Sequence, residues 1–295
     1  MPAPLPKTAF GLVYPAAIEA RYWRMLRAHV LEVQRLYLEA LERGLKGVGG
    51  SIDARAERGD SATSDASQLL RVMEEVQIPA MSPAELMAIS SSVDRHVAGE
   101  LMRTVGRSLE MAPWRANQVG MYQGWAGANA SLVTNMDLDM TNGIRDRVMT
   151  AVHEGKSTRQ LAKEIQVQTK VSSSRARLIA RDQVGKMTGA VQEVRQRSLG
   201  ITEYIWRSSI DDRTRDGTTG PADHVSLNGT TQKWSDPPFD GNENVHPGWA
   251  INCRCTAESI IPSIEEAAAM GGATEPPTIG PDMAYQWQKR FDPAA

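Results

Sequence analysis

The stretch "HPGWAINCRC", residues 246–255, holds both cysteines of a 295-residue chain. Only Arg254 separates Cys253 from Cys255, so in an extended strand both side chains point to one face, with Cα atoms about 6.6 Å apart. That separation is near the upper limit for a disulfide, and a bridge there would be strained. Three interpretations stay open: a zinc site, two thiols packed in a small core, and a disulfide.

Two of the five histidines lie near the cysteines in the sequence. His224, His246, Cys253 and Cys255 fall within 32 positions, in a segment dense in Asp, Gly, Asn, Thr and Pro. Such a composition is typical of a loop-rich module with a small core, which often needs a metal or another cross-link. Imidazole and thiolate are zinc ligands, so these four residues are a candidate zinc site, although paired zinc cysteines usually have two to four residues between them.

The same segment permits a second interpretation, a metal-dependent nuclease. Asp223 and His224, then Asn242 or Asn244, then His246, follow the residue order of a ββα-metal nuclease. In such a site one histidine activates water, while the other histidine and the aspartate hold a divalent ion. The asparagines are more simply explained by turns, and the paired CxxC knuckles are missing. A nuclease acting on DNA is therefore kept as the alternative function.

Upstream of this segment the chain is predicted to be mainly helical. Residues 1–15 carry four prolines and are expected to form an extended arm. Apolar residues recur at steps of three and four after residue 15, and Ser82, Pro83 and Glu85 form a helix start with a capping box. The predicted helices span 16–45, 82–111, 140–155, 157–166 and 172–199, with a loop over 53–68 and no assignment for 113–133.

Downstream of Gly200 the pattern changes. Residues 201–209 alternate and are rich in β-formers, which predicts a strand. A loop-rich region with few strands follows to residue 261, and then a Pro- and Gly-rich tail with a short amphipathic end containing Trp287. The fold class expected from these patterns is α+β, with a helical N-terminal region and a small loop-rich α+β domain.

Composition limits the function classes. The chain is 41% hydrophobic and 23% charged, with a formal net charge of −2, so its overall charge favours neither nucleic acid nor a membrane surface. No secretory signal is apparent and no apolar run is long enough to span a bilayer. The two cysteines do not make a disulfide framework, which indicates a reducing compartment. No sequence motif of a catalytic triad, dinucleotide site or P-loop occurs.

One segment is locally basic. Between Thr141 and Gly200 there are twelve Lys or Arg and five Asp or Glu, a formal excess of +7. A basic helical face can contact DNA phosphates, and a solvated surface is the simpler explanation of such a cluster. The residues expected to face DNA, if contact occurs, are Arg175, Arg177, Arg181 and Lys186.

From about residue 155 to 261 the order of motifs resembles the Mu F-like head-morphogenesis domain of minor capsid proteins of tailed phages. The resemblance is carried by "RARLIARDQVGKMTGAVQEVRQRSLGI" (175–201), "EYIWRSSIDDRTRDGTTGPADHVSLNGT" (203–230), a Pro-Pro pair and the His-Pro to Cys-Arg-Cys close. The matching positions are Ile179, Ala180, Arg181, Trp206, Asp211 or Asp212, Arg213, Arg215, His224, Leu227, Gly229, His246, Pro247, Cys253, Arg254 and Cys255. Two departures are the insert "GWAIN" after His-Pro and the longer "DGTTGPAD" before His224.

The resemblance implies a structural role in the virion. Such proteins are minor head components, so the expected partners are the phage portal protein, the major capsid protein and packaged DNA, with no membrane and no catalysis. The protein is expected to assemble in the host cytoplasm and to reside inside the capsid, assisting head assembly and DNA packaging or delivery. The predicted domains are a helical partner-binding region with an extended arm (1–155), the Mu F-like domain (156–261) and a flexible tail (262–295).

Overall fold

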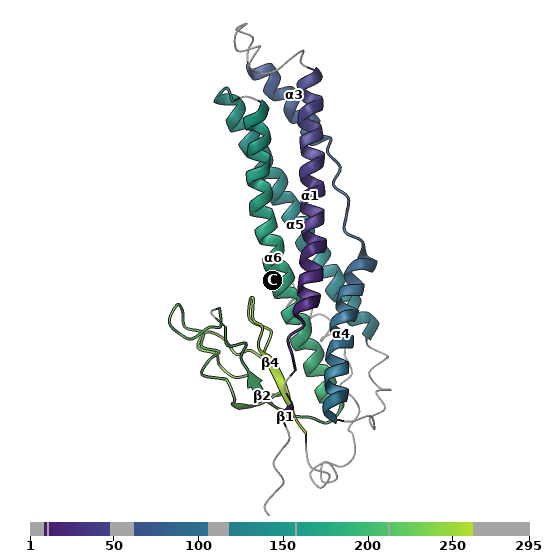
Figure 1. Cartoon of the computed structure of the whole chain (residues 1–295), viewed down its shortest axis with the longest axis vertical. Coiled ribbons are helices and arrows are strands. Elements are labelled where there is room, and N and C mark those ends of the chain that lie inside the picture. Colours follow the sequence, from purple (N-terminus) through teal and green to yellow (C-terminus); the bar gives the residue numbers. More distant parts are fainter. Residues whose placement is uncertain are drawn as a thin grey trace, which may run out of the picture. The chain divides into compact units, whose positions relative to one another are not determined.

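The computed structural model describes residues 9–10, 12–47, 62–105, 118–156, 158–211 and 213–261 (Figure 1). Predictions for the remaining positions, including most of the arm, the helix end after Val105, the cap at Ser157 and the tail 262–295 with Trp287, fall outside these residues. The described residues form these elements: β1 (Ala9–Phe10), α1 (Ala16–Gly47), α3 (Ala62–Glu74), α4 (Pro83–Val105), α5 (Gln118–His153), α6 (Thr158–Ser198), β2 (Glu203–Arg207), β3 (Thr231–Lys233) and β4 (Thr256–Ile260). The expected mainly helical α+β fold is confirmed.

The chain divides into two compact units, and each is built from segments that are distant in sequence. Unit 1 comprises Met1–Ala20, Pro83–Asn129 and Arg181–Ala295, and unit 2 comprises Arg21–Ser82 and Ala130–Ala180. Helices α1, α5 and α6 therefore each contribute residues to both units. The linear domain boundaries at residues 155 and 261 stay predictions.

Unit 2 is helical, and its core follows the apolar spacing of α1. Residues of α1 at steps of three and four are fully buried or nearly so, as the periodicity predicts. Tyr37 illustrates how this face is fixed, because its hydroxyl donates a hydrogen bond to Thr141 Oγ1 at 3.0 Å on α5. The buried α1 residues of unit 2 are Tyr22, Leu26, Val30, Val33, Tyr37, Ala40 and Leu41.

Helix α3 corrects one prediction. Residues 53–68 were expected to be a loop because they are polar, yet the chain is helical from Ala62 to Glu74. Leu69 and Met73, one turn apart, are buried, and the Cδ2 atom of Leu69 lies so close to Gly44 that a β-carbon there would stand 2.8 Å away. Burial of these two residues, with Leu69 packed against α1 at Gly44, stabilises a helix whose composition alone favours a loop.

Helices α5 and α6 are longer than the sequence predicts. α5 begins at Gln118 rather than near residue 140, and α6 is one unbroken helix where two were expected. Glycines in the first half of α5 obscured the helical pattern, but Trp125 there is fully buried and its Nε1 donates to the carbonyl of Gln183 at 3.1 Å. No glycine or proline interrupts α6 before Gly185, so nothing ends the helix between the two predicted pieces.

Unit 1 contains a four-stranded antiparallel sheet in the order β1-β4-β2-β3. The predicted strand at 201–209 is confirmed as β2, in which Tyr204 and Trp206 are fully buried. Trp206 is opposite Ala257 of β4, and Tyr204 is opposite Gln232 of β3. The core beside the sheet is formed by Tyr204, Trp206, Trp234, Val245, Ala250, Cys253, Cys255 and Ala257.

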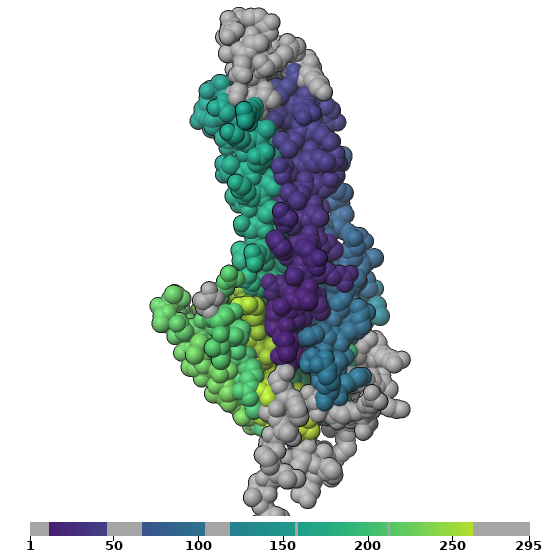
Figure 2. Space-filling view, in the orientation of Figure 1, coloured from purple at the N-terminus to yellow at the C-terminus, as the bar shows by residue number. Residues whose placement is uncertain are grey.

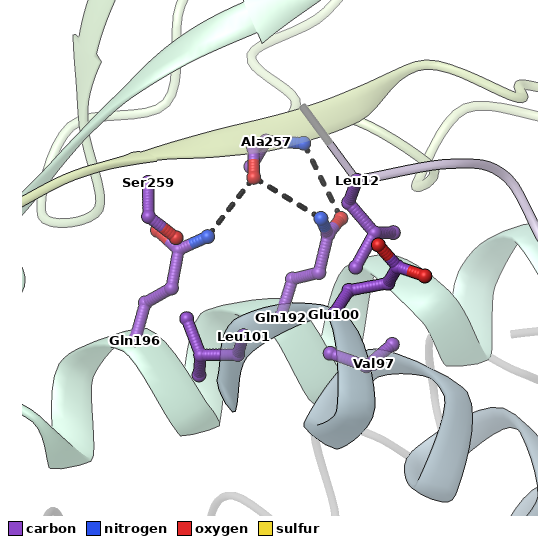
Figure 3. Close-up of a pocket in the computed structure, with 8 residues that line it drawn as sticks. All are labelled: Leu12, Val97, Glu100, Leu101, Gln192, Gln196, Ala257 and Ser259. Carbon is purple, nitrogen blue, oxygen red and sulfur yellow. Dashed lines mark hydrogen bonds between the residues drawn. The ribbon is translucent and has the colours of Figure 1, made fainter. Parts of the chain in front are cut away.

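Two glutamines of α6 hold the central strand β4 (Figure 3). Within the described residues, β1 pairs with Ile260 and Ser259 and ends before the position opposite Ala257. The carbonyl of Ala257 instead accepts hydrogen bonds from Nε2 of Gln192 at 3.1 Å and of Gln196 at 2.9 Å, and its N–H donates to Oε1 of Gln192. The side-chain amides thus satisfy backbone groups that a longer β1 would otherwise pair.

Helix α4 begins at Pro83, as the capping box predicts, and is tied to α6 by a buried ion pair. Asp94 and Arg195 are each 4% exposed, and the guanidinium donates from Nε to Oδ1 at 2.8 Å and from an Nη atom to Oδ2 at 2.9 Å. The Tyr122 hydroxyl donates to Oδ2 of the same carboxylate at 2.6 Å. α4 and α6 therefore hold each other in register within unit 1.

Among the described residues, none of the helices is both long enough and apolar enough to cross a lipid bilayer.

Candidate metal centre

Three of the four predicted zinc-site residues converge at one point in unit 1. Nδ1 of His224 lies 3.5 Å from Sγ of Cys253 and 3.5 Å from Sγ of Cys255. The three ligand atoms lie within 4.8 Å of one another. Their side chains are buried, with 2%, 4% and 3% of the surface of His224, Cys253 and Cys255 exposed. Both cysteines are free thiols, so the disulfide interpretation does not describe this structure.

The turn before the cysteines brings both sulfurs to one side. Asn252 adopts a positive φ of 59°, which turns the chain sharply just before Cys253. The backbone N–H groups of Gly248 and Cys255 both donate to Sγ of Cys253 at 3.4 Å. The inserted "GWAIN" residues, which depart from the resembled pattern, therefore form a turn that wraps around the Cys253 sulfur.

Helix α6 allows this turn to approach through two glycines. A β-carbon on Gly185 would stand 2.5 Å from the carbonyl oxygen of Cys253, and one on Gly189 would stand 2.4 Å from that of Pro247. No side chain fits at such distances, so the backbone of the turn rests directly on the helix. Nearby, Oδ1 of Asp182 accepts from the N–H of Asn252 at 2.9 Å. These contacts set the position of Cys253.

His224 is held from three sides. Its Nε2 lies 3.0 Å from Oδ2 of Asp240, a buried carboxylate. Its carbonyl accepts a hydrogen bond from the Ser208 hydroxyl, and its ring meets the Trp206 ring edge-on at 5.2 Å between centroids. An ionised carboxylate has no proton to donate, so Nε2 of His224 must be the donor in this hydrogen bond. The other ring nitrogen, Nδ1, faces the two sulfurs.

Electrostatics keep one thiol of the pair ionised. The hydrogen bond from Cys253, together with contact to His224, lowers the pKa of Cys255 to about 5 against the opposing effect of burial. The hydrogen bond to Cys255 and burial raise the pKa of Cys253 well above its ordinary value. Burial lowers the pKa of His224, but its bonds to Cys255 and Asp240 outweigh burial, so that the net shift is upward. The two thiols therefore differ, because the pKa of Cys255 is lowered and that of Cys253 is raised.

The fourth predicted ligand, His246, occupies a different place. Its Nδ1 is bonded to the Tyr204 hydroxyl at 2.8 Å, and its ring lies against Tyr204 and Trp234 with centroids 5.7 and 4.9 Å away. Among the described residues, the donor group around Cys253 contains His224 and Cys255 and does not include His246. His246 belongs to the aromatic core beside β2.

The arrangement expected for a nuclease is not formed around His224. Oδ1 of Asp223 accepts from the backbone N–H of Ser226 at 2.9 Å, where it stabilises a turn. The partner of His224 is Asp240, and His246 is bonded to Tyr204. His224 is also buried, which is unsuited to a histidine that activates water beside a DNA strand.

The four residues predicted to face DNA lie in unlike environments on α6. Arg181 and Lys186 are buried and sit in ion pairs with Glu19 at 3.6 Å and Asp182 at 3.0 Å. For these two residues the prediction is corrected, because their charges serve internal contacts. Arg175 is half-exposed and pairs with Asp139, and Arg177 is exposed above the Trp23 ring at 5.4 Å.

Sequence reasoning missed the residues that support the cluster. Asp240 lies in "DPPFDGNEN", a stretch that looks like an ordinary turn, and its Oδ1 does accept from the N–H groups of Asn242 and Glu243. Gly185 and Gly189 are four apart in a predicted helix interior, where glycine is unfavourable. That spacing was the available signal for a close approach by another part of the chain.

The cluster lies within the part of the chain that matches a family of phage proteins. Residues 142–258 match the family described as Phage Mu protein F like protein. This range runs from the second half of α5 through most of β4, and it contains His224, Asp240, Cys253 and Cys255. The resemblance stated from the sequence motifs is thereby confirmed.

A protein of Haemophilus influenzae described as uncharacterized is 30% identical over 138 residues. The match covers 47% of this chain and only 29% of that relative, so the chain spans much less than its whole length. No solved structure matches the chain significantly.

Proposed function

We propose, from the match of residues 142–258 to the Mu F-like phage family, that the chain is a minor head protein that binds the portal, the inner capsid surface, or both. The match to this family supports a role in phage head morphogenesis and a place in the virion. The family match is the observation that carries the proposal. In this role the protein assists head assembly and the packaging or delivery of DNA.

An exposed apolar face in unit 2 supports binding to a protein partner. Val167, Val171 and Leu178 of α6 are 41%, 54% and 49% exposed, and their spacing of four and seven residues places them on one side of the helix. Leu138 of α5 is 56% exposed. Clusters of exposed apolar residues of this kind are characteristic of interaction surfaces.

Packaged DNA is a second proposed partner, through fewer residues than the sequence indicated. Arg175 and Arg177 remain accessible on α6, whereas Arg181 and Lys186 are buried. Arginine guanidinium groups bind phosphates independently of sequence. We expect this contribution to be weak and strongly dependent on salt concentration.

We propose that the protein acts without catalysis. The alternative, a metal-dependent nuclease, requires Asp223, His224 and His246 to act on one ion, whereas each of them is bonded to a different partner. Incubation of the pure protein with plasmid DNA and Mg²⁺, Mn²⁺ or Zn²⁺ tests this directly. Cleavage that disappears in His224→Ala would contradict the proposal.

The binding proposal is tested by co-expression with the portal protein of the same phage, followed by pull-down and by mass spectrometry of purified heads. We expect the chain in the heads and in a complex with the portal or the shell protein. Val171→Asp combined with Leu178→Asp is expected to reduce capture about tenfold or more if this face is central to the contact. The matched control is Val119→Asp, a similarly exposed valine of α5 in unit 1. Absence of the chain from heads would contradict the proposal.

A further inference from the structure

We propose that His224, Cys253 and Cys255 bind one Zn²⁺ ion, and that this ion is a structural cross-link of the loop-rich module. Nδ1 of His224 and the two Sγ atoms are the protein ligands. The inference rests on side-chain geometry and is independent of the proposed role in phage heads.

The distances between donor atoms suit a tetrahedral ion. With a Zn–S bond of about 2.3 Å and a Zn–N bond of about 2.0 Å, tetrahedral angles place the nitrogen and sulfur ligands about 3.5 Å apart. The observed separations from His224 Nδ1 are 3.5 Å to both sulfurs. Both nitrogen–sulfur separations therefore match a tetrahedral zinc site, and all three donor atoms lie within 4.8 Å of one another.

The chemistry of the donors selects the metal. Two thiolates and one imidazole are soft or intermediate ligands, which Mg²⁺ and Ca²⁺ bind poorly because they require oxygen. Zn²⁺ accepts this combination and has no redox chemistry that would oxidise the paired thiols. The short Cys-x-Cys spacing is accommodated because Asn252 turns the chain before the first cysteine.

Groups around the ligands already stand where a zinc site needs them. Asp240 accepts a hydrogen bond from Nε2 of His224, as carboxylates do for zinc-bound histidines, and this orients the ring so that Nδ1 faces the two sulfurs. The N–H groups of Gly248 and Cys255 point at Sγ of Cys253, and they would partly neutralise a thiolate there. This supporting shell distinguishes the cluster from thiols that merely fill a core.

Burial and topology indicate a structural role for the ion. All three ligands are at most 4% exposed, which leaves no access for a substrate. His224 follows β2 by 17 positions and the cysteines directly precede β4, so the ion joins two loop segments within the region coloured green to yellow in Figure 2. The module has strands of only three to five residues, so a metal cross-link compensates for its small core. Among the described residues three side chains are in place, and the proposal assigns the fourth position to a water molecule.

The test is the zinc content of the full chain, purified under reducing conditions without chelator, measured by elemental analysis. We expect one zinc per chain. The variants His224→Gln, Cys253→Ser and Cys255→Ser are each expected to contain at least about tenfold less zinc per chain than the wild type. Two control variants are expected to keep their zinc. His153→Ala changes a histidine at the exposed end of α5, and Tyr204→Phe removes the hydroxyl that is hydrogen-bonded to His246.

A second measurement separates metal binding from misfolding of the variants. The melting temperature of the wild type and of His153→Ala should fall on addition of a zinc chelator and recover with added Zn²⁺. The ligand variants should melt lower and should not respond to chelator. A zinc-free wild type, a melting temperature unaffected by chelator, or a mass showing a Cys253–Cys255 disulfide under reducing conditions would each overturn the proposal.

Discussion

Oδ2 of Asp240 lies 3.0 Å from Nε2 of His224, and this contact decides which nitrogen of the histidine ring faces the two thiols. The carboxylate itself is fixed, because its Oδ1 accepts from the backbone N–H groups of Asn242 and Glu243 at 2.8 and 2.9 Å. Burial raises the pKa of Asp240, but these backbone bonds and the contact with His224 outweigh burial and keep the pKa below its ordinary value. An ionised carboxylate therefore orients the histidine.

Asp240→Asn is predicted to weaken zinc binding without abolishing it. The variant loses the charge that orients His224, and loss of such a contact typically lowers metal affinity about 10- to 100-fold. The measurement is competition with a chromophoric chelator. Asp223→Asn is the control, because Asp223 is adjacent to His224 in the chain but bonds to Ser226 instead. Equal affinities in the two variants would argue that Asp240 does not orient the ligand.

Gly185→Ala is predicted to destabilise the protein even though alanine favours helices. Its β-carbon would stand 2.5 Å from the carbonyl oxygen of Cys253, and relieving such a contact costs about 1–3 kcal/mol. Gly124→Ala on α5 meets nothing within 4 Å and should stabilise the helix by about 0.5–1 kcal/mol. Urea unfolding of both variants measures the difference. If both changes stabilise equally, the turn does not rest on α6 as described.

Removing one partner of the buried Asp94–Arg195 ion pair is predicted to destabilise the protein much more than replacing both partners with apolar residues. Arg195→Met leaves an uncompensated buried carboxylate and should lower the free energy of unfolding by about 3–5 kcal/mol. The double variant Asp94→Leu with Arg195→Met removes both charges and should recover much of that loss. A double-mutant cycle in urea provides the measurement, and additive losses would contradict the prediction.

Gln196→Ala is predicted to loosen the attachment of β4 to α6. The side chain donates to the carbonyl of Ala257 and accepts from Nε1 of Trp234 at 3.0 Å, so both buried groups would lose a partner. A loss of about 1–3 kcal/mol in the free energy of unfolding is expected. Gln166→Ala, at an exposed position of the same helix, should change stability by less than about 0.5 kcal/mol. If both substitutions have a similar effect, the hydrogen bonds of Gln196 to Ala257 and Trp234 contribute little to stability.

Strong local signals in the sequence predicted part of the fold. The apolar spacing of α1, the capping box at Pro83 and the alternation around Trp206 each specify an element through neighbouring residues, and the structure confirms all three. Elements stabilised mainly by distant contacts were missed. The first half of α5 depends on Trp125 reaching Gln183, and α3 depends on Leu69 packing at Gly44.

The candidate site shows the same division. Residue type and order correctly predicted that His224, Cys253 and Cys255 lie close together. They also predicted His246, which has the same imidazole side chain as His224 but lies in the aromatic core. Nothing local separates the two histidines, because the choice depends on which of them meets Asp240 and which meets Tyr204. Likewise, the burial of Arg181 and Lys186 depends on Glu19 and on the packing of the whole unit, so their charge alone suggested an exposed face.

The most direct test of the metal centre is the absorption spectrum of the full chain reconstituted with Co²⁺, a spectroscopic substitute for Zn²⁺. Coordination by His224, Cys253 and Cys255 predicts intense visible bands of tetrahedral cobalt together with sulfur-to-cobalt charge-transfer absorption, both displaced by Zn²⁺. The charge-transfer absorption should be about halved in Cys255→Ser if that variant still binds cobalt, and absent if it does not. A weak spectrum typical of six-coordinate cobalt in the wild type, without charge-transfer absorption, would contradict a metal bound by the two thiols.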